Sequence, residues 1–189
     1  IKDGSDVIDP RFIVKLKDYW GNEESCDATP RSSDGQLLFL MEMVNKMKSP
    51  EHNGIGGRIA SAHNGSSLFT GDAGGGESNI RRYIIENDLL NAIVQLPNNL
   101  FYNTGITTYI WLLSNNKPKH RQGKVQLIDA SLMFRKLRKN LGNKNCEFAP
   151  EHIAEIMQTY LAGQDVERQL DEQNDPIGIA SKVFDNQDF

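Results

Sequence analysis

Hydrophobic residues recur along the chain in two spacings, one typical of helices and one typical of strands. Residues 34–47 are apolar nearly all round and follow a capping-box spacing from Ser33 to Gln36, which predicts a buried helix. Residues 150–163 place apolar side chains three and four positions apart between a proline and a glycine, which predicts a helix with one packed face. A third helix is predicted from Ser78 onward.

Short runs of small, β-branched and aromatic residues between turn signals predict strands. They are residues 58–63, 89–96, 106–113 and 125–128. The loop 97–105 that joins the middle two is too short for a parallel crossover, which needs about a dozen residues or more. We therefore expect residues 89–96 and 106–113 to pair antiparallel, with residues 58–63 parallel beside one of them. Helices and strands in this order predict an α/β fold.

Changes in polarity along the chain predict four regions. The two ends are polar and carry turn signals, whereas the helix and strand patterns lie between them. The regions are an irregular loop over residues 1–33, the α/β alternation over 34–131, a basic connector with a packed helix over 132–163, and a polar, loosely held tail over 164–189.

The composition is that of an ordinary globular protein, with 38% hydrophobic and 24% charged residues. No segment approaches the roughly 18 apolar residues of a membrane helix, and the first residues form no signal peptide, so we expect a cytoplasmic protein. Cys26 and Cys146 are far apart, and the four histidines show no metal-ligand spacing. The sequence therefore predicts free thiols and no metal site.

Charge is distributed unevenly along the chain. Residues 1–116 carry 10 Lys and Arg against 14 Asp and Glu, residues 117–144 carry nine against one, and residues 145–189 carry two against ten. The net charges of these segments are -4, +8 and -8, which add to the -4 of the whole chain. The basic block indicates contact with a polyanion or with a complementary subunit, and a merely solvated surface is the alternative.

One loop and its flanks carry a specific pattern. The chain reads Val94-Gln95-Leu96-Pro97 and then Asn99-Leu100-Phe101-Tyr102-Asn103-Thr104-Gly105-Ile106. This resembles the signature of the modification subunit of type I restriction–modification systems, a family of adenine-N6 DNA methyltransferases. Further segments that agree in order and spacing, over about residues 9–163, are Asp9-Pro10-Arg11-Phe12, Gly56-Gly57-Arg58, Ile80-Arg81-Arg82-Tyr83-Ile84 and Gly123 to Ser131.

The resemblance implies a fold, a cofactor and partners. It implies the C-terminal half of a Rossmann-like methyltransferase sheet over residues 34–131, ending in an antiparallel strand pair. It also implies S-adenosylmethionine as methyl donor, double-stranded DNA as substrate, and the specificity and restriction subunits of a type I complex as partners.

Two family motifs are missing from this sequence. The family binds its cofactor through a glycine-rich turn after the first strand, and it holds the adenine amino group with an Asn-Pro-Pro-Phe/Tyr tetrapeptide, a positioning role. Neither occurs here, and both are expected upstream of Ile1, which is not an initiator methionine. We therefore expect an excised fragment that does not transfer methyl groups by itself, with a tail that normally runs on beyond Phe189.

The loop residues Phe101, Tyr102, Thr104 and Gly105 are the candidates for binding the target base. Enzymes that modify a base take it out of the duplex and stack it on aromatic faces, and the resemblance places this loop beside that pocket. The alternative is that Phe101 belongs to the core. Thr104 and Gly105 would shape the turn, where the glycine allows a close approach or a positive φ.

Other candidates have two interpretations each. The basic residues Arg135, Lys136, Arg138 and Lys139 could contact DNA phosphates or another subunit. Asp34 could cap a helix, or could contact the cofactor as the family's helix at this place suggests. The glycine run 71–76 before a helix could cradle a phosphate, but Glu77 would repel one, and a flexible connector is favoured.

Two classes of function follow. The first is part of a DNA-modifying enzyme, and the second is a non-catalytic module that docks on DNA or on other subunits. A related rival, a protein methyltransferase acting on glutamine N5, shares the Asn-Pro-Pro tetrapeptide, but the Thr-Gly-Ile loop and the segment from Asp9 to Phe12 argue against it.

Overall fold

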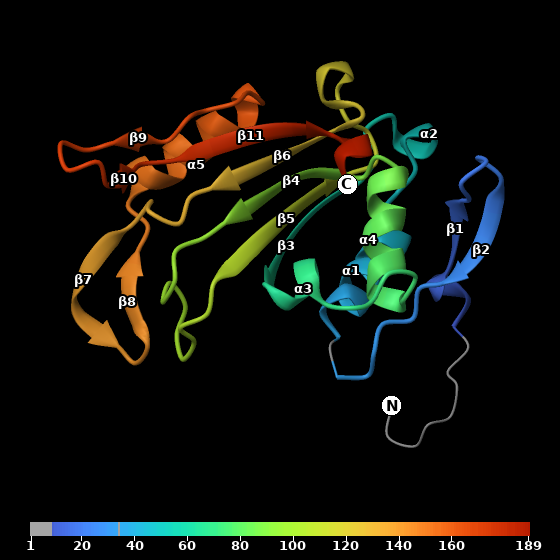
Figure 1. The fold of residues 1–189 in the computed structure, drawn as a ribbon, viewed down its shortest axis with the longest axis horizontal. Coiled ribbons are helices and arrows are strands. Elements are labelled where there is room, and N and C mark those ends of the chain that lie inside the picture. The colour runs from blue at the N-terminus through green and yellow to red at the C-terminus, as the bar shows by residue number, and fades with distance from the viewer. Residues whose placement is uncertain (1–8, 34) are drawn as a thin grey trace.

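The centre of the molecule is one mixed sheet with helices on it (Figure 1). A computed structural model describes residues 9–33 and 35–189. In spatial order, the sheet consists of β11 (Ala180–Asp185), β6 (Lys124–Asp129), β4 (Leu90–Gln95), β5 (Thr108–Ser114) and β3 (Arg58–Asn64). The predicted α/β class is confirmed.

The strand directions confirm one prediction and correct another. β4 and β5 pair antiparallel, with Val94 opposite Ile110, as the short loop between them requires. β3 was expected to lie parallel to its neighbour, but it pairs antiparallel with β5. β3 and β4 do run in the same direction, because both flank β5 antiparallel. β3 and β4 follow each other in the sequence but are not neighbours in the sheet, because β5 lies between them.

The helices pack against the sheet through two clusters of apolar side chains. The helices are α1 (Gln36–Asn45), α2 (Pro50–Asn53), α3 (Ser66–Phe69), α4 (Gly76–Glu86) and α5 (Pro150–Ala162). Leu40 of α1 and Ile84 of α4 are fully buried with Trp111 in the first cluster. Val94 and Ile128 form the second cluster, against which α5 packs.

Helix α1 differs from its prediction in two respects. Its N-cap is Gly35, which makes no side-chain capping bond, so the expected capping box from Ser33 to Gln36 is wrong. It is also not buried all round, because Phe39 is 68% exposed while Leu37 and Leu40 are buried. An apolar run therefore overstated how much of the helix surface meets the sheet.

Residues 10–27 form regular structure, which corrects the irregular loop expected over residues 1–33 for this part of it, while residues 1–8 lie outside the described residues. A short 3-10 helix, η1 (Pro10–Phe12), leads into an antiparallel hairpin of β1 (Ile13–Lys17) and β2 (Glu23–Asp27). Val14 and Leu16 are the buried positions of β1 and belong to the first cluster. This period of two is the strand signal, and it is short because only one face of one strand is buried.

The C-terminal segment is also ordered, so the expectation of a loosely held tail is wrong. β11 forms an edge of the central sheet and pairs antiparallel with β6. The side chain of Gln126 donates to the Ser181 hydroxyl at 2.8 Å. A small hairpin of β9 (Gln169–Leu170) and β10 (Pro176–Ile177) precedes it, and the 3-10 helix η3 (Asn186–Asp188) follows. Main-chain pairing, which composition does not reveal, holds this polar segment in place.

Helix α5 confirms the predicted position and ending, with Gly163 in the left-handed region at φ 59°. Only part of its apolar stripe packs, however. Ile156 and Tyr160 contact the second cluster, whereas Ile153 and Met157 are half-exposed. The predicted packed face is therefore narrower than the stripe.

A buried ion pair joins Asp88, in the turn after α4, to Lys117, in the segment after β5. The Lys117 side chain is 2% exposed, and its ammonium lies 2.6 Å from the Asp88 carboxylate and 2.8 Å from the Lys124 carbonyl oxygen. Burial lowers the pKa of Lys117, and the Asp88 carboxylate opposes that shift. Asp88 itself is in the left-handed region at φ 53°, which asparagine also tolerates.

The substitution Asp88→Asn should lower the free energy of unfolding by about 3 kcal/mol, because it leaves a buried ammonium without a negative charge beside it. Chemical denaturation of the two proteins measures the difference. The double variant Asp88→Asn/Lys117→Met is the control, since removing both charges should restore most of the loss. An Asp88→Asn protein as stable as the original would show that the pair contributes little.

Candidate functional site

The loop that joins β4 to β5 (residues 96–107, called the β4–β5 loop) reverses the direction of the chain. Leu96 still donates to the Thr108 carbonyl at 2.9 Å, after which the chain leaves the sheet. Asn99 and Asn103 are in the left-handed region, with φ of 56° and 58°. Asparagine enters this region more readily than most residues, so these two positions allow the chain to reverse.

The aromatic pair lies between these two turn residues and faces outward. Leu100 is buried in the second cluster, and the next two side chains, Phe101 and Tyr102, are 43% and 63% exposed. Phe101 is a member of neither apolar cluster. The alternative that Phe101 belongs to the core is therefore not what the structure has.

Thr104 and Gly105 close the turn. The Thr104 hydroxyl accepts a long hydrogen bond from the Ile106 amide at 3.4 Å. A side chain at Gly105 would place its Cβ 2.8 Å from the Asn99 amide oxygen. Gly105 is not in the left-handed region, so its role in the loop is the close approach to the Asn99 side chain, and the positive φ values belong to asparagines. The sequence reasoning missed those asparagines.

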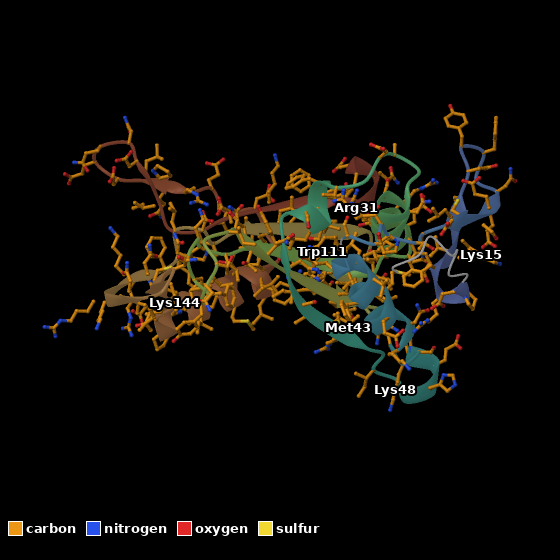
Figure 2. All side chains as sticks on the ribbon, turned by 90° about the horizontal axis from the view of Figure 1, so that it is seen from below. Lys15, Arg31, Met43, Lys48, Trp111 and Lys144 are labelled. Atoms are coloured by element: carbon orange, nitrogen blue, oxygen red, sulfur yellow. The ribbon has the colours of Figure 1, made fainter. Side chains whose placement is uncertain are left out.

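A second hairpin, β7 (Arg135–Leu141) and β8 (Lys144–Glu147), lies beside the β4–β5 loop at the same end of the sheet (Figure 1). We call residues 135–147 the basic hairpin. It replaces the connector that was expected within 132–163. Figure 2 labels Lys144 at the end of the molecule opposite Lys15 of β1.

Strand β8 is bonded to the loop along three consecutive residues. The Lys144 ammonium donates to the Leu100 carbonyl at 2.7 Å, and the Asn145 amide donates to the Asn99 carbonyl at 3.1 Å. The Cys146 thiol donates to the Asn98 carbonyl at 3.2 Å, and burial raises the pKa of this thiol, which keeps its proton. The sequence placed Lys144 in a basic block, but it gave no sign of this contact across 44 positions.

Strand β7 carries all four predicted basic contact residues, and all four are exposed. Arg135 pairs with Glu147 across the hairpin at 2.9 Å. Within the described part of the chain, Lys136, Arg138 and Lys139 form no ion pair. Their charges are therefore available to an external anion. The structure thus brings the basic residues and the aromatic pair to the same end of the central sheet (Figure 1).

The glycine run before α4 does not form an anion site. Glu77 is 6% exposed, and its carboxylate accepts from the Arg31 amide at 3.1 Å and pairs with the Arg31 guanidinium at 3.3 Å. A side chain at Gly76 would collide with the Thr29 carbonyl oxygen. The glycine thus serves close packing at the helix start, where a carboxylate already lies.

The predicted cofactor contact, Asp34, lies outside the described residues. A cavity of about 1680 Å³ runs over the sheet between α4 and β11, and none of the predicted site residues that the structure describes lines it. Two of its carboxylates are already paired, Glu86 with Arg82 at 2.6 Å and Asp129 with Arg168. This lining contains no glycine-rich turn of the kind the cofactor needs, and we place no cofactor there.

The described residues contain neither a candidate metal site nor a membrane-spanning helix. No group of three or more His, Cys, Asp or Glu side chains in residues 9–33 and 35–189 could hold a metal ion. No helix in the same part of the chain is long and apolar enough to cross a membrane.

Comparison with known proteins finds similarity to DNA methylases. The family model described as N-6 DNA Methylase matches residues 10–176. The methylase subunit of the type I restriction enzyme HindI from Haemophilus influenzae is 32% identical over 168 residues, 84% of this chain and 33% of that protein. The MjaVII methylase subunit from Methanocaldococcus jannaschii is 39% identical over 94 residues, 50% of this chain and 16% of that protein.

A solved structure shares the fold. The type I restriction–modification methyltransferase subunit from Streptococcus thermophilus superposes with a TM-score of 0.65 and 23% identity, over 84% of this chain and 28% of that one. These matches cover about a third or less of each relative. Because the family model matches most of the residues, including the loop and the basic hairpin, the chain belongs to the N-6 DNA methylase family, as do the methylase subunits of type I restriction enzymes.

Proposed function

We propose that this chain is part of a DNA methyltransferase that transfers a methyl group from S-adenosylmethionine to adenine N6 within a type I restriction–modification complex. Its own contribution is to bind the target base and the DNA backbone next to it. The observation that carries the proposal is the exposed pair Phe101 and Tyr102, held beside the basic hairpin at one end of the sheet.

The chemistry of the two surfaces fits this role. A base that leaves the duplex loses its stacking neighbours, and an exposed aromatic ring replaces them. The phosphates on either side of that base meet the cations of Lys136, Arg138 and Lys139, which release counterions from the DNA. Thr104 and Gly105 contribute by fixing the shape of the loop. S-adenosylmethionine supplies the methyl group, and its main binding motif is absent from this sequence. Asp34 remains a proposal as a minor cofactor contact.

The non-catalytic binding module is the second candidate. The half-exposed side chains of Ile153 and Met157, with the exposed Leu161, favour it, since they leave apolar surface on α5 for another protein. The specificity and restriction subunits are the partners that we propose for the complex. Methyl transfer by the intact protein separates the two candidates.

The natural protein that contains this chain should methylate adenine N6 in DNA, whereas the chain alone should not. The chain alone should also bind S-adenosylmethionine with a dissociation constant weaker than about micromolar, since one tetrapeptide and one turn that hold the reactants are missing. Labelled methyl incorporation and calorimetric titration measure the two quantities. Micromolar or tighter binding by the isolated chain would mean that its own residues do more cofactor binding than we propose.

A further inference from the structure

We propose that Lys144 is a positioning residue, which sets the place of the aromatic pair Phe101 and Tyr102 relative to the DNA backbone. This inference rests on the proposed function of the β4–β5 loop as the site of the target base. Lys144 would act through the loop and through Tyr102, without contacting the base.

The contacts place Lys144 at the last attachment of the loop. Asn98 and Asn99 are bonded to β8 through Cys146 and Asn145, and Leu100 is bonded through the Lys144 ammonium at 2.7 Å. The following residue is Phe101, where the side chains become exposed. Removing the ammonium therefore frees the backbone immediately before the aromatic pair, while the two attachments behind it stay.

The same ammonium also faces the second ring of the pair. Its nitrogen lies 5.7 Å from the centroid of the Tyr102 ring, within the range of a cation–π interaction. The tip of the hairpin meets the far side of the loop, since a side chain at Gly142 would lie 3.3 Å from the Asn103 amide oxygen. The basic hairpin is thus bonded to the loop before Phe101 and lies close to it again after Tyr102.

This arrangement joins DNA-backbone binding to base binding. Lys136 on β7 lies directly opposite Cys146 on β8, so the strand that presents cations is paired with the strand that holds the loop. Phosphates that fix β7 therefore also fix the loop through β8. Lys144 differs from the other cations of the hairpin, because it is half-buried and turned to the loop, whereas Lys136 and Lys139 are exposed.

The test compares Lys144→Met with Lys139→Met in the intact methyltransferase, with 2-aminopurine at the target position of its DNA. Both variants remove one lysine charge from the same hairpin. Lys144→Met should lower the equilibrium constant for base flipping, read from the 2-aminopurine signal of saturated complexes, by about tenfold, the effect of one charge-assisted hydrogen bond. Its cofactor affinity and its salt dependence of DNA binding should stay unchanged. Lys139→Met should weaken DNA binding and its salt dependence while leaving the signal at saturation unchanged.

The conservative variant Lys144→Arg keeps a cation and a donor, and it should restore most of the signal. A structural role alone would lower the melting temperature of Lys144→Met without changing the signal per folded molecule, and that result would overturn the inference. A normal signal in Lys144→Met, with a reduced one in Phe101→Ala, would overturn the inference and leave the proposed function standing. If wild-type protein gives no signal and Phe101→Ala changes nothing, the proposed function itself fails.

Discussion

Replacing Arg135, Lys136, Arg138 and Lys139 with glutamine should make DNA binding by the intact methyltransferase much less sensitive to salt. Each phosphate that a protein neutralises contributes about 0.9 to the slope of log affinity against log salt, so four contacts contribute about 3.6. When the salt concentration rises fourfold, the unsubstituted protein should then lose roughly 150-fold more affinity than the variant. Arg135 already pairs with Glu147, so it should contribute the least of the four.

Binding isotherms at several salt concentrations measure the slope. A matched control replaces four exposed lysines at the other end of the molecule, Lys15, Lys17, Lys46 and Lys48 (Lys15 and Lys48 are labelled in Figure 2). This control removes the same charge and should change the slope little, because those residues are far from the β4–β5 loop. If the basic hairpin variant binds DNA with an unchanged slope but no longer assembles with the specificity or restriction subunit, the hairpin is a subunit contact.

The parts of the fold that the sequence predicted are those with strong local signals. β4 and β5 are runs of buried apolar residues, and the short loop between them forces antiparallel pairing. Helix α5 has a proline at its start and a glycine at its end, each of which acts within one turn. Such signals depend on residues that are neighbours in the sequence, so they can be recognised without knowing which distant segments come into contact.

The parts of the fold that could not be predicted from the sequence depend on partners far away in the chain. β7 is made largely of arginine and lysine, which do not favour strands, and β8 gives it its main-chain bonds. Half of the residues of β11 are polar, and the strand is ordered by pairing with β6. The predicted direction of β3 was wrong for the same reason, since the strand beside it comes about 50 residues later, after two helices and a strand.

The candidate site shows the same division. Phe101 and Tyr102 could be selected from the sequence, because aromatic residues in a loop often bind a ligand. The structure does expose them. The basic block was also visible. That the two lie side by side at one end of the sheet could not be predicted, because the bonds between β8 and the loop join residues more than 40 positions apart.

The exposure of Phe101 decides what its removal should do. In the intact methyltransferase, Phe101→Ala should take away a stacking partner worth about 1–3 kcal/mol per base. A loss of this size weakens capture of the flipped adenine by roughly 5- to 150-fold. A buried phenylalanine would instead cost about 3–5 kcal/mol of stability on truncation. Because Phe101 is 43% exposed and belongs to neither apolar cluster, we expect the loss in base capture, with a nearly unchanged melting temperature.

Three measurements on Phe101→Ala separate the two patterns: 2-aminopurine fluorescence at the target position, affinity for S-adenosylmethionine, and melting temperature. Phe69→Ala is the matched control, since Phe69 is 79% exposed on α3 and lies away from the β4–β5 loop. It removes the same side chain from the surface and should leave the fluorescence unchanged. A destabilised Phe101→Ala protein whose folded fraction still flips the base normally would refute the stacking role, because the ring would then act only through the fold.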